Sequence, residues 1–221
     1  MTRPWYVRNP EVYEDVRSQI EDKYPDLSCI LENGKALVRG YYPICEDGQV
    51  LDRYMIELIL PEDSLRGLPT LYETAGRIER DVTHHMGKDG AACVVLPDAF
   101  WYDHPGGMTP LEFLDGPVCS YFASQSLVER GQPSAWPVGQ WEHGVAGIVE
   151  FYGELLETTD RSVILAFLER LKAEVVRGHW SCPCGSGNRI RDCHLQRILE
   201  VRQKIPRQVA ALSAAALGSH R

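Results

Sequence analysis

The sequence predicts an α+β protein: an N-terminal helix, a four-strand antiparallel meander, C-terminal helices, and a small appendage with a terminal helix. Three patterns support this fold class. Apolar residues repeat at helical spacing over 10–23, short strand-like stretches separated by tight-turn sequences fill 27–80, and helical spacing returns after residue 109. Three of the seven cysteines crowd into residues 182–193, which sets the appendage apart.

The first 80 residues carry the expected helix and sheet. Asn9 and Pro10 have the order of a helix start, so a helix is expected over 10–23. Asn33-Gly34 is a strong signal for a two-residue hairpin turn. The four expected strands are Leu27–Glu32, Lys35–Tyr42, Val50–Leu60 and Thr70–Ile78.

Helices are expected in the rest of the main domain. Thr109 and Glu112 have the spacing of a capping box, and Gly116-Pro117 is expected to restart this helix, which runs to about residue 130. Further helices are expected over 144–157, from Thr159 or Asp160 through Leu171, and over 195–217 with a kink at Pro206. We expect two domains, 1–176 with a core of its own and the appendage 177–221.

Composition excludes several classes of protein. The chain of 221 residues is 44% hydrophobic and 24% charged, which is ordinary for a globular protein. No apolar run approaches the ~20 residues that span a bilayer, and the polar N-terminus lacks the apolar core of a signal peptide. We therefore expect a cytoplasmic protein with no membrane partner.

The net charge of −8 is unevenly distributed. Residues 180–221 hold seven Lys and Arg against two acidic residues, a net +5, which leaves −13 on residues 1–179. An acidic main domain argues against nucleic acid as its partner, because phosphate binding needs concentrated Lys and Arg. The basic tail either meets an acidic surface or is a solvated face.

Residues Cys182, Cys184, Cys193 and His194 have the spacing of a closed structural zinc site. In a cytoplasmic chain, clustered cysteines are better explained as metal ligands than as disulfides. Four ligands within thirteen residues complete a tetrahedron without help from elsewhere, and Gly185 allows the chain to turn sharply between them. The alternative is a loop of unligated cysteines. We expect zinc as a structural cofactor.

The run Cys182-Pro-Cys184-Gly-Ser-Gly, with the closing Cys193-His194, resembles the SEC-C family of zinc modules. That family is found at the tail of bacterial protein-translocation ATPases and on many other bacterial proteins. The resemblance covers residues 180–194 and implies a bacterial origin and an accessory docking module rather than a reaction.

A second candidate site surrounds Cys93. A glycine-containing loop brings His84 and His85 towards this thiol, a setting in which a cysteine can act as a nucleophile. The alternative is that Cys93, which precedes Val-Val-Leu, is a small buried hydrophobe.

The order of elements and the residues around Cys93 resemble the ubiquitin-conjugating enzymes over about residues 10–175. That family has a helix, a four-strand meander, a loop with the catalytic cysteine, and further helices. His85 stands eight residues before Cys93, at the offset of the family's Asn. The residues that match the family's spacing are Pro61, Pro69, Gly90 and Trp101. The resemblance implies a ubiquitin-conjugating-like fold for 1–176 and a thioester on Cys93.

Two departures from that family bear on the mechanism. His85 replaces an amide that polarises the transfer intermediate, so the His85 N–H is expected to donate this hydrogen bond instead. The family's Asp two residues after the cysteine is Val95 here. The stretch Trp136–Gly144 resembles a motif of the bacterial relatives, which occur in conjugation and anti-phage signalling operons. That resemblance implies that His143 reaches the Cys93 loop; the alternative is a helix-start residue.

These resemblances imply an enzyme, a bacterial ubiquitin-conjugating-like acyltransferase of anti-phage defence. Its partners would be an activating enzyme and a ubiquitin-like protein or nucleotidyltransferase cargo, whose activated C-terminal carboxylate it would carry on Cys93. Two alternatives stay open: a catalytically inactive binding module, and a Cys–His hydrolase.

The other cysteines offer one rival nucleophile. A helix that started at Pro117 would place Cys119 in its first turn, where the helix dipole lowers the pKa of a thiol, although neighbouring apolar residues suggest an inward face. Cys29 and Cys45 lie in expected strands and are expected to be structural.

Overall fold

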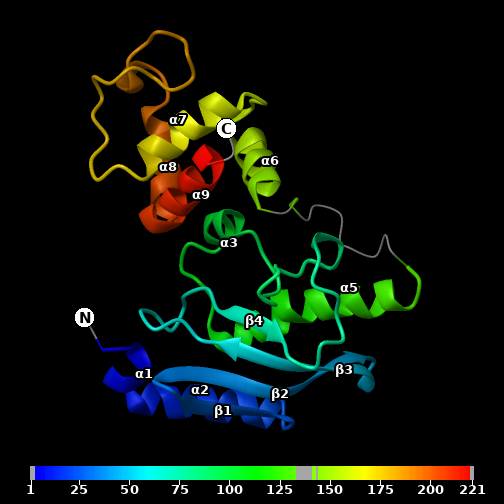
Figure 1. Ribbon diagram of the computed structural model, residues 1–221. Coiled ribbons are helices and arrows are strands. Elements are labelled where there is room, and N and C mark those ends of the chain that lie inside the picture. The colour runs from blue at the N-terminus through cyan, green and yellow to red at the C-terminus, as the bar shows by residue number, and fades with distance from the viewer. Residues whose placement is uncertain (1–2, 133–140, 143, 220–221) are drawn as a thin grey trace. The chain divides into compact units, whose positions relative to one another are not determined.

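The computed structural model describes residues 3–132, 141–142 and 144–219. The chain packs into two compact units (Figure 1). The first contains Met1–Val94 and Gly107–Gln140, and the second contains Val95–Gly106 and Trp141–Arg221. The chain therefore enters the second unit after Val94, returns to the first at Gly107, and enters the second again at Trp141.

A four-strand antiparallel sheet forms the centre of the first unit, as the sequence predicts. Its strands follow one another in the order β1-β2-β3-β4. Asn33 and Gly34 have φ angles of 51° and 79°, the left-handed conformation that a tight hairpin turn requires. The strands are β1 (Leu27–Glu32), β2 (Lys35–Glu46), β3 (Gln49–Ile59) and β4 (Thr70–Glu73). The predicted alternation holds in β3, where Tyr54, Ile56 and Leu58 are buried.

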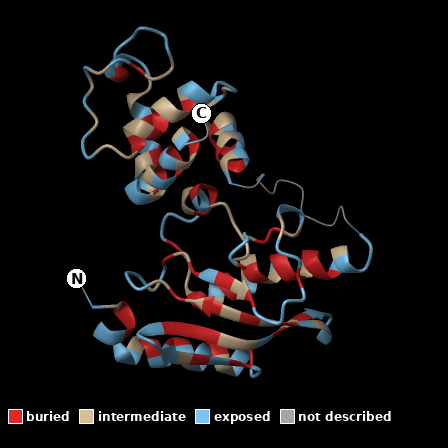
Figure 2. Ribbon diagram, in the orientation of Figure 1, coloured by how far each residue is buried: buried red, intermediate tan, exposed pale blue. Residues whose placement is uncertain are grey.

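Helices cover one face of this sheet. Tyr42 and Tyr54 are direct partners on β2 and β3, and the ring of Phe122 contacts both, with centroid distances of 6.0 and 4.4 Å. Tyr24, which ends α2, contacts Tyr42 from the same side. Figure 2 shows the buried residues that line this layer. The helices are α1 (Trp5–Arg8), α2 (Pro10–Lys23), α4 (Pro110–Phe113) and α5 (Cys119–Glu129).

The expected helix restart at Gly116-Pro117 is wrong. The capping box of Thr109 and Glu112 forms, but the helix continues from α4 through a π-helical segment, Leu114–Val118, directly into α5. Pro117 lies inside this segment, where the wider turn accommodates the missing N–H. Cys119 is consequently an interior residue of a continuous helix.

The second unit is a helical bundle that includes the cysteine-rich appendage. Its buried carboxyl group, Asp98, accepts hydrogen bonds from Tyr152 Oη at 2.7 Å and Ser213 Oγ at 2.6 Å, which ties three helices together. Burial raises the pKa of Asp98. The helices are α3 (Pro97–Asp103), α6 (Val145–Leu156), α7 (Arg161–Leu171), α8 (Leu195–Lys204) and α9 (Arg207–Ser219). Residues 195–217 thus form two helices, separated at Pro206.

The division into units differs from the expected boundary at residue 176. Ile164 and Phe167 of α7 share one buried cluster with Ile190 of the appendage and Ile198 of α8. The appendage therefore has no separate core, because α6 and α7 provide the apolar surface that it covers.

Several arginines of the basic tail bind carbonyl groups within the second unit. The guanidinium of Arg202 donates to the carbonyl oxygens of Leu171, the last residue of α7, at 2.7 Å and of Ala173 at 2.6 Å. Arg197 reaches the carbonyl of Leu155 at the end of α6. Since helix C-termini carry partial negative charge, this part of the tail's charge stabilises the bundle itself.

Among the helices of the described residues, none combines the length and the apolar character needed to cross a membrane.

Candidate metal centre and thiol site

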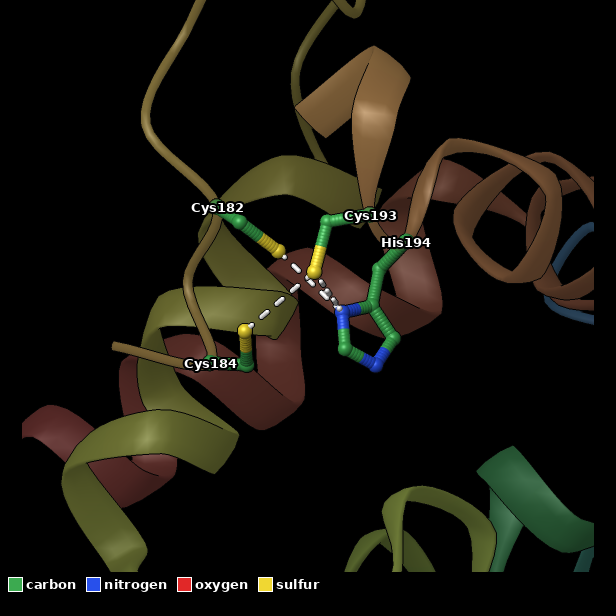
Figure 3. Close-up of side chains that lie close together, drawn as sticks. All are labelled: Cys182, Cys184, Cys193 and His194. Atoms are coloured by element: carbon green, nitrogen blue, oxygen red, sulfur yellow. Dashed lines mark hydrogen bonds between the residues drawn. The ribbon is translucent and has the colours of Figure 1, made fainter. Parts of the chain in front are cut away.

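Three thiols and one imidazole converge in the appendage, as the sequence predicts. His194 Nδ1 lies 3.2 Å from Cys182 Sγ and 3.1 Å from Cys193 Sγ, and the sulfurs of Cys184 and Cys193 are 3.6 Å apart. All four ligand atoms lie within 4.8 Å of one another and can hold a metal ion. Figure 3 shows the four side chains pointing towards one common centre.

A short backbone hairpin holds the first two cysteines. The Cys182 N–H donates to Asn188 O and the Ile190 N–H to Trp180 O, both at 2.8 Å. Gly185 at the turn has a φ of 79°, a conformation that favours glycine. Cys193 ends a 3₁₀ turn, Ile190–Asp192, which brings the last two ligands back to the first two.

Polar and aromatic contacts support the cluster. The Ser186 hydroxyl lies 3.2 Å from Cys184 Sγ and 3.5 Å from Cys193 Sγ. Hydrogen bonds with this hydroxyl, with the Ser186 backbone and with the thiols of Cys182 and Cys193 together lower the pKa of Cys184 to about 6, which favours the thiolate that a metal needs. The His194 ring packs edge-on against Phe167 at 5.4 Å.

The donor set fits zinc. Zinc prefers four sulfur and nitrogen ligands at about 2.0–2.3 Å, which corresponds to ligand–ligand separations of roughly 3.5–3.8 Å in a tetrahedron. The three separations of 3.1–3.6 Å require only small outward movements of the side chains. Cys182 is buried in the core of the unit, so the cluster is anchored to the bundle.

The second candidate site lies in the loop after β4. The side chain of Cys93 is exposed, which excludes the alternative of a buried hydrophobe. Its N–H donates to the carbonyl of His85 at 2.7 Å, and the adjacent Ala92 N–H donates to Leu71 O of β4 at 2.8 Å. The loop therefore fixes the Cys93 backbone against the sheet on one side and against His85 on the other.

The thiol of Cys93 is not activated by its surroundings. Although the side chain is exposed, protein atoms around the sulfur desolvate it, and this desolvation raises the pKa of Cys93. The carboxylate of Asp89 raises the pKa further. A thiolate poised at neutral pH would need cationic neighbours instead.

The two histidines before this loop differ in setting. His85 is 9% exposed and has a φ of 53°, the left-handed conformation, which ends the 3₁₀ turn Val82–His84. His84 Nδ1 lies 2.9 Å from Asp81 Oδ1. Hydrogen bonds from Thr83 and His84 lower the pKa of Asp81 to about 2. The structure pairs the backbones of His85 and Cys93, whereas His143 lies outside the described residues.

Two side chains near this loop were not predicted from the sequence. Tyr121 Oη and Gln125 Nε2, both on α5, donate to the carbonyl of His84 at 3.0 and 2.7 Å. The only signal in the sequence is a pair of polar residues at i and i+4 on an otherwise apolar helix face.

The other cysteines of the first unit are not comparable sites. Cys119 lies inside the continuous helix rather than in a first turn, so the helix-dipole argument for it does not apply. It is also an electrostatic neighbour of buried Tyr42. Burial raises the pKa of Cys29 to about 12. Cys45 is exposed near the β2–β3 turn.

Comparisons with family models, with curated proteins and with solved structures find no match for this chain.

Proposed function

We propose that this protein is a ubiquitin-conjugating-like acyltransferase whose first unit carries an activated carboxylate as a thioester on Cys93. The cargo is the C-terminus of a ubiquitin-like protein or of an anti-phage nucleotidyltransferase, delivered by an activating enzyme in the bacterial cytoplasm. The zinc-binding cluster of the second unit is structural and supports docking.

The observation that carries this proposal is the placement of Cys93. An exposed thiol stands in the long loop that follows a helix and a four-strand meander, with its backbone hydrogen bonded to His85. A protein-sized acyl group needs such an open position, because a thiol in a narrow pocket would exclude it. We take His85, whose backbone carbonyl accepts the Cys93 N–H, as the donor for the oxyanion of the transfer step.

The raised pKa of Cys93 is compatible with carrying an acyl group. The thiol attacks the activated carbonyl, its proton passes to solvent, and the activating group leaves. An amine or a second thiol then attacks the thioester carbonyl, and Cys93 departs as a thiolate that regains a proton. Because a thiol of higher pKa is a poorer leaving group, the thioester is less exposed to loss by water before the target arrives.

The test is a charging assay with purified activating enzyme and candidate cargo. Wild type should form an adduct that reducing agent cleaves, and Cys93→Ala should form none, whereas Cys45→Ser should charge normally. His85→Asn should discharge a preformed thioester faster than His85→Ala. Removal of one oxyanion donor costs about 10²–10³-fold. Asn also tolerates the left-handed backbone at this position better than Ala does. His85→Gly, which removes the donor without backbone strain, therefore separates hydrogen bonding from strain. A protein that never charges would refute the proposal.

A binding module is the second candidate function. The raised pKa of Cys93 favours it, because a protein that only holds partners needs no reactive thiol. The same shift argues against the Cys–His hydrolase, which requires a thiolate at neutral pH. Binding of cargo by a chain that cannot be charged would identify the module.

A further inference from the structure

Two buried polar side chains of α5 bind one backbone carbonyl of the Cys93 site. Gln125 is fully buried and Tyr121 is 2% exposed. Gln125 Nε2 lies 2.7 Å and Tyr121 Oη 3.0 Å from His84 O, so both lone pairs of this carbonyl are used. The two side chains also lie 3.3 Å apart, Nε2 to Oη.

The side-chain amide of Gln125 uses its N–H donors but not its oxygen acceptor. Its Oε1 is buried and has no hydrogen-bond partner among the described residues. Leaving a buried acceptor unpaired is unfavourable, and an apolar side chain would fill the same space without this penalty. An unsatisfied buried group of this kind calls for an explanation beyond packing. The hydrogen bond that Gln125 makes to the loop provides one.

The His84 carbonyl is one peptide unit before the His85 carbonyl, to which the Cys93 N–H is hydrogen bonded. The peptide from His84 leads into His85, which has the left-handed conformation and accepts the Cys93 N–H at 2.7 Å. A rotation of the His84 peptide would therefore move the His85 carbonyl and release Cys93. The Cys93 thiol also raises the pKa of Tyr121, after desolvation, which indicates that the phenol lies near the sulfur.

We propose that Tyr121 and Gln125 are positioning residues for Cys93. By clamping the His84 carbonyl from within the core, they hold the His85 carbonyl and the Cys93 backbone in one arrangement. Both side chains are buried and act through this carbonyl. The role in acyl transfer rests on the proposed function; the role in holding the loop does not.

The test compares Tyr121→Phe and Gln125→Met with wild type. Tyr121→Phe removes one oxygen and Gln125→Met removes both donors at similar volume. The matched control is Ser124→Ala, which removes a buried hydroxyl of the same helix that donates within α5, to Ser120 O. The first readout is amide hydrogen exchange at Cys93, measured together with β2 and β3 as internal references.

We expect exchange at Cys93 to rise about tenfold or more in both variants, with no change in β2 and β3, and no change at Cys93 in Ser124→Ala. The second readout separates formation of the thioester from its discharge. Discharge of a preformed thioester should slow about tenfold or more, because misplacement by about 1 Å costs up to 10²-fold.

Exchange at Cys93 that stays at the wild-type value, or that rises only in step with β2 and β3, would overturn the proposal, since either result means that the pair contributes stability without positioning. Should Gln125→Met fail to fold, Tyr121→Phe decides alone, because it changes a single atom. If the wild-type protein does not charge but the variants show increased local exchange at Cys93, the positioning role of Tyr121 and Gln125 is supported and the acyltransferase proposal is refuted.

Discussion

Replacing Cys184 by Ser is expected to release the proposed zinc ion and to destabilise the second unit alone. Cys184 contributes one of the four ligand atoms, and its side chain is only partly buried, so the substitution leaves the apolar core intact. The effect on stability should therefore come from the metal. Cys45→Ser is the matched control, because it changes a cysteine outside the cluster.

The magnitude follows from binding linkage. At the weak end of the range for structural zinc sites, about 10 kcal/mol, the dissociation constant is about 50 nM. Free zinc at about 5 µM then stabilises the folded unit by about 2.7 kcal/mol. For a unit of about 90 residues, 1 kcal/mol shifts the melting temperature by about 4–8 °C, so a fall of about 10–20 °C is expected.

The assay combines metal analysis with thermal unfolding followed by hydrogen exchange in each unit. Wild type and Cys45→Ser should contain one zinc per chain, and Cys184→Ser much less. Exchange should increase in α7, α8 and α9, which share the core with Ile190 of the appendage. Stoichiometric zinc in Cys184→Ser would refute the ligand assignment. Equal destabilisation of β2 and β3 would refute the separation into two units.

Three further predictions concern the thiols and the division of the chain. In peptide mapping after brief iodoacetamide treatment, Cys93 should react ahead of buried Cys29 but more slowly at pH 7 than a free peptide thiol. Because its pKa is raised, the rate of alkylation of Cys93 should still rise above pH 9. A rate that is flat above pH 7 would contradict this. The pKa of Cys29 is about 12 in the folded chain against an ordinary 9.0, so the unfolded chain loses this proton first and the free energy of unfolding should fall as the pH rises from 9 to 12, by about 1 kcal/mol per pH unit. Cys29→Ala cannot titrate and should flatten that decline in denaturant titrations; an unchanged slope would assign it to other groups. A 1–176 fragment should keep the sheet protected from hydrogen exchange. It should also bind hydrophobic dyes, because α6 and α7 lose their packing partners α8 and α9. Protection of α6 and α7 from exchange would show instead that 1–176 has a sufficient core.

Local signals made the sheet and the metal cluster predictable. The turn at Asn33-Gly34 and the alternation in β3 fix register and facing within a few residues, so neighbouring strands follow from the sequence. The four ligands also lie close together along the chain, and their convergence needs no knowledge of distant packing.

Features that depend on distant partners were missed. Helix α1 has only four residues, and its position depends on the Trp5 indole donating to Pro61 O. Helix α3 begins at Pro97 and is held by contacts to α6, α8 and α9 that no local pattern reveals. Short helices of this kind derive their stability from tertiary contacts rather than from propensity.

The candidate thiol site was predicted in part for the same reason. The glycine-containing loop predicted that His85 comes close to Cys93, and the backbones of the two residues are hydrogen bonded. The buried pair on α5 acts across some forty residues of sequence, and the unit boundary results from a core shared by helices on both sides of residue 176. Neither has a signature in sequence spacing.

The carbonyl contacts of Arg202 bear on how the Cys/His cluster would take up a metal ion. Arg202 holds the chain at Leu171 and Ala173, where the segment that contains the cluster begins, and that segment ends where α8 starts. Both ends of this segment of about 20 residues are thus attached to α8 without the ion. This attachment lowers the entropy that metal binding would lose in closing the loop. After chelation, the ligands should remain near one another at high effective concentration, so that reloading is fast and returns the same four atoms to the metal. The affinity of the cluster for the ion would then depend in part on the Arg202 guanidinium, which is not a metal ligand.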